Sequence, residues 1–361
     1  MKILITHATA GAGHQKAAEA VRDGLQSNSN HQVTLVDALD YTNPFFKNTY
    51  KNSYTFLITR WPKVWGVFFG LVDIPWLQPL VKIARRIQNG LNGRKLQQFM
   101  IDQQFDYILS THFMPIEVAS SLRKKGLIKS KIMACVTDFD VHRIWLGDAV
   151  DRYCVASGWT LEKVKKLGVS PEKITVTGIP SNKKFSVKYD VPALKNQFAL
   201  DQTQFTILIA TGSFGIGPIE EIIDALNDFQ IIVVCGHNKN LFQRLSTKAN
   251  ERVKILGLVN NMHELMAVSD MMVTKPGGLS ITEALVSHLP MIFFNAIPGQ
   301  ETGNIRVLKE YGVGISDCTI EQIAKELRAI RSSSTKLKEL KDKTKAVAKP
   351  GAVDDIISLI R

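Results

Sequence analysis

The sequence predicts an α/β protein made of two doubly wound, Rossmann-like domains that face a cleft. Short apolar segments rich in β-branched residues alternate with helical patterns along nearly the whole chain, which indicates parallel sheets with helices on both faces. The length of 361 residues suits two domains. A largely polar stretch over 178–192 carries two prolines and interrupts the alternation, which then starts again.

The first strand is predicted at 3–5, where an apolar run precedes a glycine-rich turn and a helix with one apolar face. The other strands of the first domain are predicted at 31–37, 107–109, 131–136, 152–155 and 174–176. Those of the second are predicted at 205–210, 231–235, 253–256, 271–273, 291–294 and 312–315. We expect an N-terminal domain over 1–180, a C-terminal domain over 181–335, and helices over 336–361 that pack back on the first domain.

The charge balance predicts an anionic partner. The net charge is +12, which suits an acidic membrane face or phosphorylated ligands, whereas no motif of a nucleic-acid-binding protein accompanies it. The four cysteines are far apart and form no CxxC pair, which argues against a zinc site and a disulfide framework. No apolar run reaches the roughly 18–20 residues that span a bilayer, so we expect membrane contact to be peripheral.

Residues 47–95 depart from the α/β pattern. They hold nine basic residues and one acid, with three of the five tryptophans (Trp61, Trp65 and Trp76) and with Phe56, Phe68 and Phe69. Basic residues mixed with Trp and Phe suit the surface of an anionic membrane. The same composition also fits a helical insertion whose aromatic side chains form core, and composition leaves both readings open.

Four glycine-rich or polar turns follow predicted strands. The first contains Gly11, Gly13 and His14, where a neutral imidazole at a helix start could act as a general base. A dinucleotide-binding turn with Asp37 on the ribose is the rival, although the third glycine is missing; a turn with a capping histidine is the simpler one. The others are 211–218, 275–283 and 297–304, and plain turns remain possible for each.

A DxD pair, Asp138 and Asp140, follows another predicted strand, with His142 close behind. In some enzymes a DxD holds a metal-bound nucleotide sugar, but an isolated pair arises easily by chance. We therefore expect no metal here, and we expect Asp138 or His142 to face the cleft.

Together these motifs resemble one family over nearly the whole chain. GAGHQKAAEAV, VTDFDVHRIW, VTGIP, TKPGGLSITEAL and IPGQETGN are similar to the diacylglycerol glucosyltransferases and monogalactosyldiacylglycerol synthases, in the same order. These are inverting GT-B glycosyltransferases related to the GlcNAc transferase of peptidoglycan synthesis. One departure is Gly303, where the family usually has a bulkier polar residue.

The resemblance implies different roles for the two domains. His14 is the favoured general base, with Asp138 as its rival or helper. The UDP-sugar would be held by Gly13, Gly212, Ser213, Leu258, Val259, Pro276, Gly277, Gly278, Glu283, Gln300, Glu301 and Asn304. Membrane or acceptor contacts would involve Trp61, Trp65, Phe68, Phe69, Arg85, Arg86 and His142.

The expected reaction transfers a hexose, glucose favoured, from a UDP-sugar to diacylglycerol with inversion. The expected partners are UDP-hexose, diacylglycerol and an anionic membrane, with no nucleic acid, no cofactor and no metal, at the cytoplasmic face of the cell membrane. Galactose as the donor sugar, a UDP-GlcNAc transferase or epimerase, an NAD-dependent oxidoreductase and a non-catalytic membrane-binding protein are the alternatives.

Overall fold

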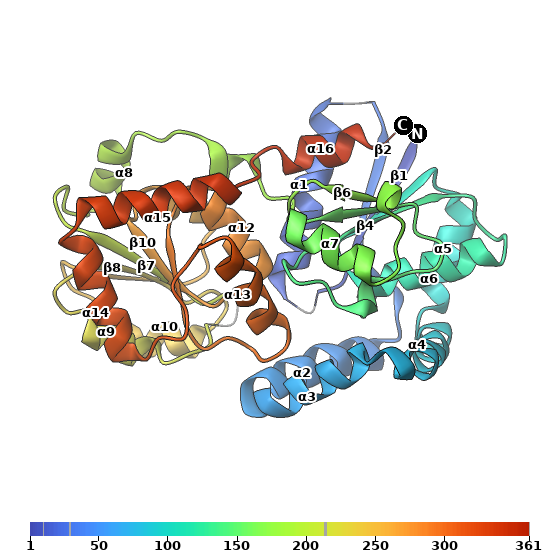
Figure 1. Cartoon of the computed structure of the whole chain (residues 1–361), viewed down its shortest axis with the longest axis horizontal. Helices are drawn as coiled ribbons and strands as arrows, with labels where there is room; N and C mark the ends of the chain where they lie inside the picture. The colour runs from blue at the N-terminus through green and yellow to red at the C-terminus, as the bar shows by residue number, and fades with distance from the viewer. Residues whose placement is uncertain (10, 29, 213–214, 361) are drawn as a thin grey trace. The chain divides into compact units, whose positions relative to one another are not determined.

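The computed structural model describes the chain apart from residues 10, 29, 213–214 and 361. The chain divides into two compact units (Figure 1). Unit 1 consists of Met1–Asn182, Ile297–Asn304 and Gly351–Arg361. Unit 2 consists of Lys183–Ala296 and Ile305–Pro350. A short loop and the end of the chain therefore belong with the N-terminal half.

Unit 1 is built on a six-stranded parallel sheet of order β2-β1-β3-β4-β5-β6. Leu4 and Ile108 face one core cluster and Ile3, Ile5 and Leu109 the other, because successive side chains of a strand point to opposite faces. The sheet is thus buried on both sides. Its strands are β1 (Lys2–His7), β2 (Gln32–Asp37), β3 (Tyr107–Ser110), β4 (Lys131–Cys135), β5 (Arg152–Val155) and β6 (Ile174–Val176).

Helices cover both faces of this sheet. One face packs against α5 (Arg94–Gln103), α6 (Phe113–Lys124) and α7 (Gly158–Lys166). The other packs against α1 (Ala12–Asn28) and α16 (Ala352–Ser358). Helices α1 and α16 approach closely, since a Cβ added at Gly24 would lie 2.4 Å from Cγ1 of Val353.

Unit 2 contains a five-stranded parallel sheet of order β11-β10-β7-β8-β9. Its strands are β7 (Thr206–Ala210), β8 (Gln230–Val234), β9 (Val253–Leu256), β10 (Met271–Thr274) and β11 (Met291–Phe293). The strand predicted at 312–315 is wrong, because within the described residues this segment makes one isolated bridge, between Ile315 and Ile292. The two helix-covered parallel sheets confirm the predicted fold class.

The helices of unit 2 include α9 (Ile219–Ala225), α10 (Lys239–Ser246), α11 (Met262–Ala267), α12 (Gly278–Val286), α14 (Ile320–Arg331) and α15 (Ser334–Val347). The polar stretch over 178–192 forms η5 (Lys183–Ser186) and leads into α8 (Val191–Gln197). Helix η5 packs within unit 2, where the hydroxyl of Ser287 donates to the carbonyl of Phe185 at 3.2 Å. Helix α13 (Gln300–Glu310) begins in unit 1 and ends in unit 2.

The basic aromatic segment is helical. After η1 (Ala38–Tyr41) it forms α2 (Pro44–Arg60), α3 (Pro62–Asp73), η2 (Pro75–Leu77) and α4 (Gln78–Asn92), to one side of the sheet of unit 1 (Figure 1). In the described chain, no helix by itself has the length and apolarity to cross a membrane. The pair Pro62–Asp73 and Pro75–Gly90 meets that test only together, bent by 74°.

Candidate active site

His14 lies in the first turn of α1, directly after Gly13. Its Nδ1 is 2.7 Å from the carbonyl oxygen of Thr111 and 2.9 Å from Oγ1 of Thr137. A carbonyl oxygen only accepts hydrogen bonds, so Nδ1 carries the proton and donates it. The other ring nitrogen, Nε2, therefore keeps its lone pair and can accept a proton.

The surroundings of His14 keep its imidazole neutral. Burial lowers its pKa from 6.5 to about 4, against the opposing effect of the hydrogen bond to Thr111. The ring of His112 meets that of His14 edge-on at 4.8 Å between centroids, and burial also lowers the pKa of His112 well below its ordinary value. At neutral pH both rings are uncharged, which is the state that a general base requires.

Asp138 follows β4, one residue after Thr137. Its carboxylate accepts hydrogen bonds from Nε2 of Gln300 at 3.1 Å and from Nδ2 of Asn304 at 3.3 Å. Burial raises the pKa of Asp138 to about 6, although the two amide donors oppose this shift. The structure thus brings Asp138 together with two of the three polar residues predicted in the loop 297–304.

The loop itself is fixed by its own polar groups. The carboxylate of Glu301 accepts from the backbone N–H of Ile297 at 2.7 Å, and Oδ1 of Asn304 accepts from the N–H of Phe139 at 2.8 Å. The packing around Gly303 explains why this position departs from the family pattern. A Cβ added at Gly303 would lie 2.7 Å from Oδ2 of Asp140. Only a residue without a side chain fits there unless Asp140 moves.

The carboxylates of Asp138 and Asp140 already bind other side chains of the protein. Asp138 is held by the two amides, and Asp140 forms an ion pair with Lys163. Within the part of the chain that the structure describes, no group of three or more His, Cys, Asp or Glu side chains is arranged to hold a metal ion.

Two other candidates have structural partners. Asp37 caps η1, accepting from the N–H of Leu39 at 3.0 Å and from that of Thr9 at 3.3 Å. His142 accepts from the N–H of Ile144 through Nδ1, so its Nε2 donates to the carbonyl of Phe69 at 2.9 Å. His142 therefore connects α3 to the short helix η3 (Arg143–Trp145).

The predicted membrane side chains differ in exposure. Trp61 and Phe68 are exposed, whereas Trp65 and Phe69 are half-buried, and the tilted rings of this second pair contact each other at 5.9 Å between centroids. Arg86 reaches Asp148 and Arg85 pairs with Glu117.

Sequence reasoning missed the stripe on α4 formed by Leu80, Ile83 and Ile87, all exposed. Their spacing of three and four residues was a visible signal of one helix face.

In unit 2, the predicted glycine turns leave neighbouring strands at the same edge of the sheet. Thr274 of β10 is in register with Ala210 of β7, and their chains continue into the turns at Gly277 and Gly212. Gly212 has φ +76°, a backbone conformation that favours glycine. Pro276 and Gly277 precede α12, which begins at Gly278 and contains the half-buried Glu283. Leu258 is exposed and Val259 half-buried after β9, and Ser213 lies outside the described residues.

Three groups near the candidate sites were not predicted. Thr111 and Thr137 hold His14 but lie 97 and 123 residues from it in the chain. The hydroxyl of Thr211, beside Gly212, is buried and has no hydrogen-bond partner among the described residues.

Comparison with known proteins gives a consistent picture over both units. A family model described as monogalactosyldiacylglycerol (MGDG) synthase matches residues 14–180. A model described as the glycosyltransferase family 28 C-terminal domain matches residues 206–356. Processive diacylglycerol beta-glucosyltransferases of Bacillus cereus (strain G9842) and Bacillus anthracis (strain CDC 684 / NRRL 3495) are each 28% identical over 366 residues, covering 99% of this chain and 93% of theirs.

Solved structures share the fold. MurG of Acinetobacter baumannii aligns with a TM-score of 0.60 and 17% identity, over 99% of this chain and 98% of its own. The S. aureus MnaA–UDP co-structure aligns with a TM-score of 0.64 and 14% identity, over 100% and 96%. Anabaena HepE in complex with UDP aligns with 0.59 and 16%, over 100% and 99%. These likenesses confirm the expected GT-B fold.

Proposed function

Because this chain belongs to the family of the monogalactosyldiacylglycerol synthases and diacylglycerol glucosyltransferases, and is a glycosyltransferase, we propose that it transfers a hexose from a UDP-sugar to the hydroxyl of 1,2-diacylglycerol. The observation that carries this proposal is the hydrogen bonding of His14. The bond from Nδ1 to the carbonyl of Thr111 leaves Nε2 as a neutral acceptor at the start of a helix.

The reaction proceeds with inversion. The diacylglycerol oxygen attacks the anomeric carbon of the hexose from the face opposite UDP, and its proton passes to Nε2 of His14. The bond between the anomeric carbon and the UDP oxygen breaks with its electron pair, so the product is a β-glycoside and UDP leaves. Base assistance of this kind contributes about 10²–10⁴-fold to the rate.

We assign the UDP part of the donor to the glycine turns of unit 2. The N-terminus of α12 at Gly277 and Gly278 favours the growing negative charge on UDP, in the role that a metal ion has in other transferases. Glu283 would bind the ribose, and the backbone at Leu258 and Val259 would bind the uracil. No metal or cofactor takes part in this scheme.

Glucose is the favoured donor sugar, because the relatives similar over 99% of this chain are named glucosyltransferases. Galactose is the second candidate, because the model that matches 14–180 is described as monogalactosyldiacylglycerol synthase. The acceptor lipid stays in the bilayer, so the enzyme acts as a peripheral protein at the cytoplasmic face of the cell membrane. The exposed aromatic side chains Trp61 and Phe68 support this placement.

One experiment tests the whole proposal. The protein is incubated with diacylglycerol vesicles and with UDP-glucose, UDP-galactose or UDP-GlcNAc separately, and the lipid products are identified by mass and anomeric configuration. We expect a β-glucosyl diacylglycerol, and we expect His14→Ala to lose nearly all product while it still binds UDP. An α-linked product, no glycolipid with any donor, or full activity of His14→Ala would each contradict the proposal.

A further inference from the structure

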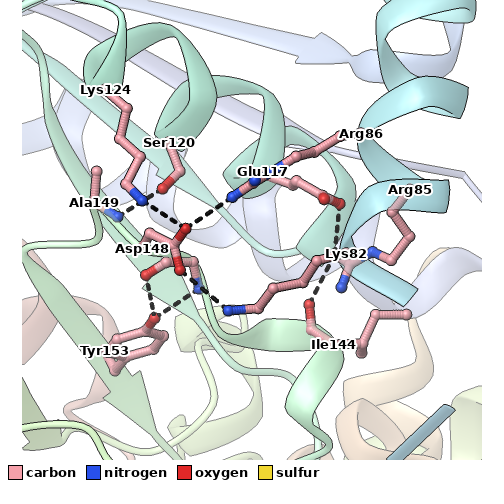
Figure 2. A network of polar contacts seen from close by, with 11 residues as sticks. Lys82, Arg85, Arg86, Glu117, Ser120, Lys124, Ile144, Asp148, Ala149 and Tyr153 are labelled. Carbon is pink, nitrogen blue, oxygen red and sulfur yellow. Dashed lines mark hydrogen bonds and ion pairs between the residues drawn. The ribbon is translucent and has the colours of Figure 1, made fainter. Parts of the chain in front are cut away.

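A cavity of about 340 Å³ lies in unit 1, apart from His14 and Asp138. It is lined by residues of α4 and α6, by Gln97 of α5, by Lys125 and by residues 146–148. Figure 2 shows that Lys82, Arg86 and Lys124 reach Asp148. A cavity of this size falls within the roughly 300–1,000 Å³ of sites for small ligands.

The lining of this cavity is strongly positive. Five cationic side chains contribute to it, and two carboxylates, Glu117 and Asp148, oppose them, which leaves a surplus of three positive charges. The cations are Lys82, Arg85, Arg86, Lys124 and Lys125.

Asp148 alone receives three of these cations. Its two oxygens lie 3.2 Å from Nζ of Lys82, 2.9 Å from a terminal nitrogen of Arg86 and 2.7 Å from Nζ of Lys124 (Figure 2). These contacts hold the pKa of Asp148 down at about 2, the hydrogen bond from Lys124 first. The same positive potential that keeps this carboxylate charged favours any further anion that enters the cavity.

The cations around Asp148 offer more hydrogen-bond donors than this carboxylate can accept. Lysine carries three N–H donors and arginine five, whereas one carboxylate offers about four lone-pair positions. Arg85 is already bound by the carboxylate of Glu117 at 2.7 Å and by the carbonyl of Ile144 at 3.1 Å. The side chains of Lys82, Arg86 and Lys124 are partly exposed, so their remaining donors can reach a ligand.

We propose that this cavity binds a phosphate group, carried by a lipid headgroup or by a free phosphate compound. A phosphate presents several acceptor oxygens at once, and the guanidinium of Arg86 can bind two of them side by side. The lipid source has support on the same helix, because Leu80, Ile83 and Ile87 form an exposed apolar stripe on α4. This inference involves no sugar transfer, so its outcome is independent of the proposed reaction.

Calorimetric titration of the full chain with inorganic phosphate, without UDP-sugar or lipid, tests the site. We expect saturable binding, and we expect Arg86→Gln with Lys124→Gln to weaken it at least tenfold. A matched control, Lys338→Gln with Lys349→Gln, removes the same charge from exposed positions of unit 2 and should bind as the unchanged protein does. Equal loss in both double variants, or unchanged binding in the first, would overturn the proposal.

A second variant separates ligand binding from a merely structural role of the cluster. Asp148→Asn keeps the shape of the side chain but removes the negative charge that an incoming phosphate meets. We therefore expect several-fold tighter phosphate binding, because the surplus of positive charge rises. If the cations serve only to fasten α4, this variant loosens the cavity and binds phosphate no better, which would count against the site.

Vesicles identify the source of the phosphate. The protein is bound to phosphatidylcholine vesicles with and without phosphatidylglycerol, and inorganic phosphate is then added in excess at constant ionic strength. Release from the phosphatidylglycerol vesicles, absent in the Arg86→Gln/Lys124→Gln variant, supports the site and assigns it to a headgroup. Saturable phosphate binding without such release supports the site and assigns it to a free compound.

Discussion

Thr137 positions the candidate base. Its hydroxyl lies 2.9 Å from Nδ1 of His14, and its own proton can go to the carbonyl of Thr111 at 3.4 Å, the same oxygen that accepts from the ring. The ring is therefore held by two groups on neighbouring strand ends, one of them a backbone atom that no substitution removes.

Thr137→Val should lower kcat while it leaves KM for the donor nearly unchanged, because the hydroxyl orients the base and touches no substrate. A hydrogen bond of this kind contributes about 1 kcal/mol, which corresponds to roughly a fivefold loss of rate. Steady-state kinetics measure the effect, and Thr137→Ser, which keeps the hydroxyl, should restore the rate. A Thr137→Val enzyme with unchanged kcat would remove Thr137 from this role.

His14 and Asp138 make opposite contributions to the pH dependence of stability. The pKa of Asp138 is raised from 3.8 to about 6 in the folded state, so its contribution to stability is lost as pH rises through that window. The pKa of His14 is lowered from 6.5 to about 4, so its contribution is lost as pH falls through nearly the same window. The two effects largely cancel between pH 4 and 6.

Asp138→Asn should remove the contribution of Asp138 to the pH dependence of stability. The free energy of unfolding of this variant, relative to the unchanged protein, should increase from pH 4 to pH 6 and level off above. The total increase should be about 3 kcal/mol or less, since each pKa unit corresponds to about 1.4 kcal/mol. Denaturant titrations at several pH values measure it, and a difference that does not vary with pH would mean that Asp138 titrates normally.

At the scale of elements, helix α4 has two faces with different side chains. Lys82 and Arg86 reach Asp148, whereas Leu80, Ile83 and Ile87 are exposed. Apolar side chains exposed in a row on one helix suit the boundary between headgroups and acyl chains.

Replacing Leu80, Ile83 and Ile87 together by Gln should reduce binding to diacylglycerol vesicles containing phosphatidylglycerol at least tenfold. Each side chain contributes about 1 kcal/mol or more when it enters the membrane, and folding is spared because all three are exposed. Vesicle co-sedimentation measures the loss. Leu127→Gln with Val187→Gln, also exposed, is the control, and an equal loss there would mean that the effect is not specific to α4.

The elements differed in how well the sequence could predict them. Buried parallel strands were predicted closely because they are continuous apolar runs bounded by glycine or polar turns. The segment 312–315 alternates glycine with an apolar residue and makes a single bridge, because pairing depends on a neighbouring strand that the sequence does not show. The sequence pattern of helices α2 to α4 was harder to interpret. Several of their apolar residues are exposed, so apolar positions there do not mark a buried face.

At the scale of the whole molecule, the candidate site draws on segments far apart in the chain. The strand-end rule predicted His14 and Asp138 individually, because both follow strands of one parallel sheet. It could not predict that Thr111 and Thr137 hold His14, or that Gln300, 162 residues away, holds Asp138. These contacts depend on which strands become neighbours and on where the loop 297–304 packs. Local sequence patterns predict neither.

Nucleotide binding by the whole chain distinguishes a UDP-sugar transferase from an NAD enzyme. A ligand at one hundred times its Kd stabilises the folded state by about 2.7 kcal/mol, so UDP should raise the melting temperature and NAD should not. Gly277→Ala is the most informative variant. An added Cβ at this position has no atom within 4 Å, so the protein without ligand should fold normally.

In the complex, however, that methyl group would stand at the start of α12, where the diphosphate must approach the backbone. We therefore expect Gly277→Ala to melt as the unchanged protein does without ligand but to lose most of the shift produced by UDP. Gly351→Ala, also at a helix start with no atom within 4 Å of the added Cβ, should keep the full shift. If Gly277→Ala retains it too, the nucleotide does not bind at this turn, and the assignment of the donor to unit 2 fails.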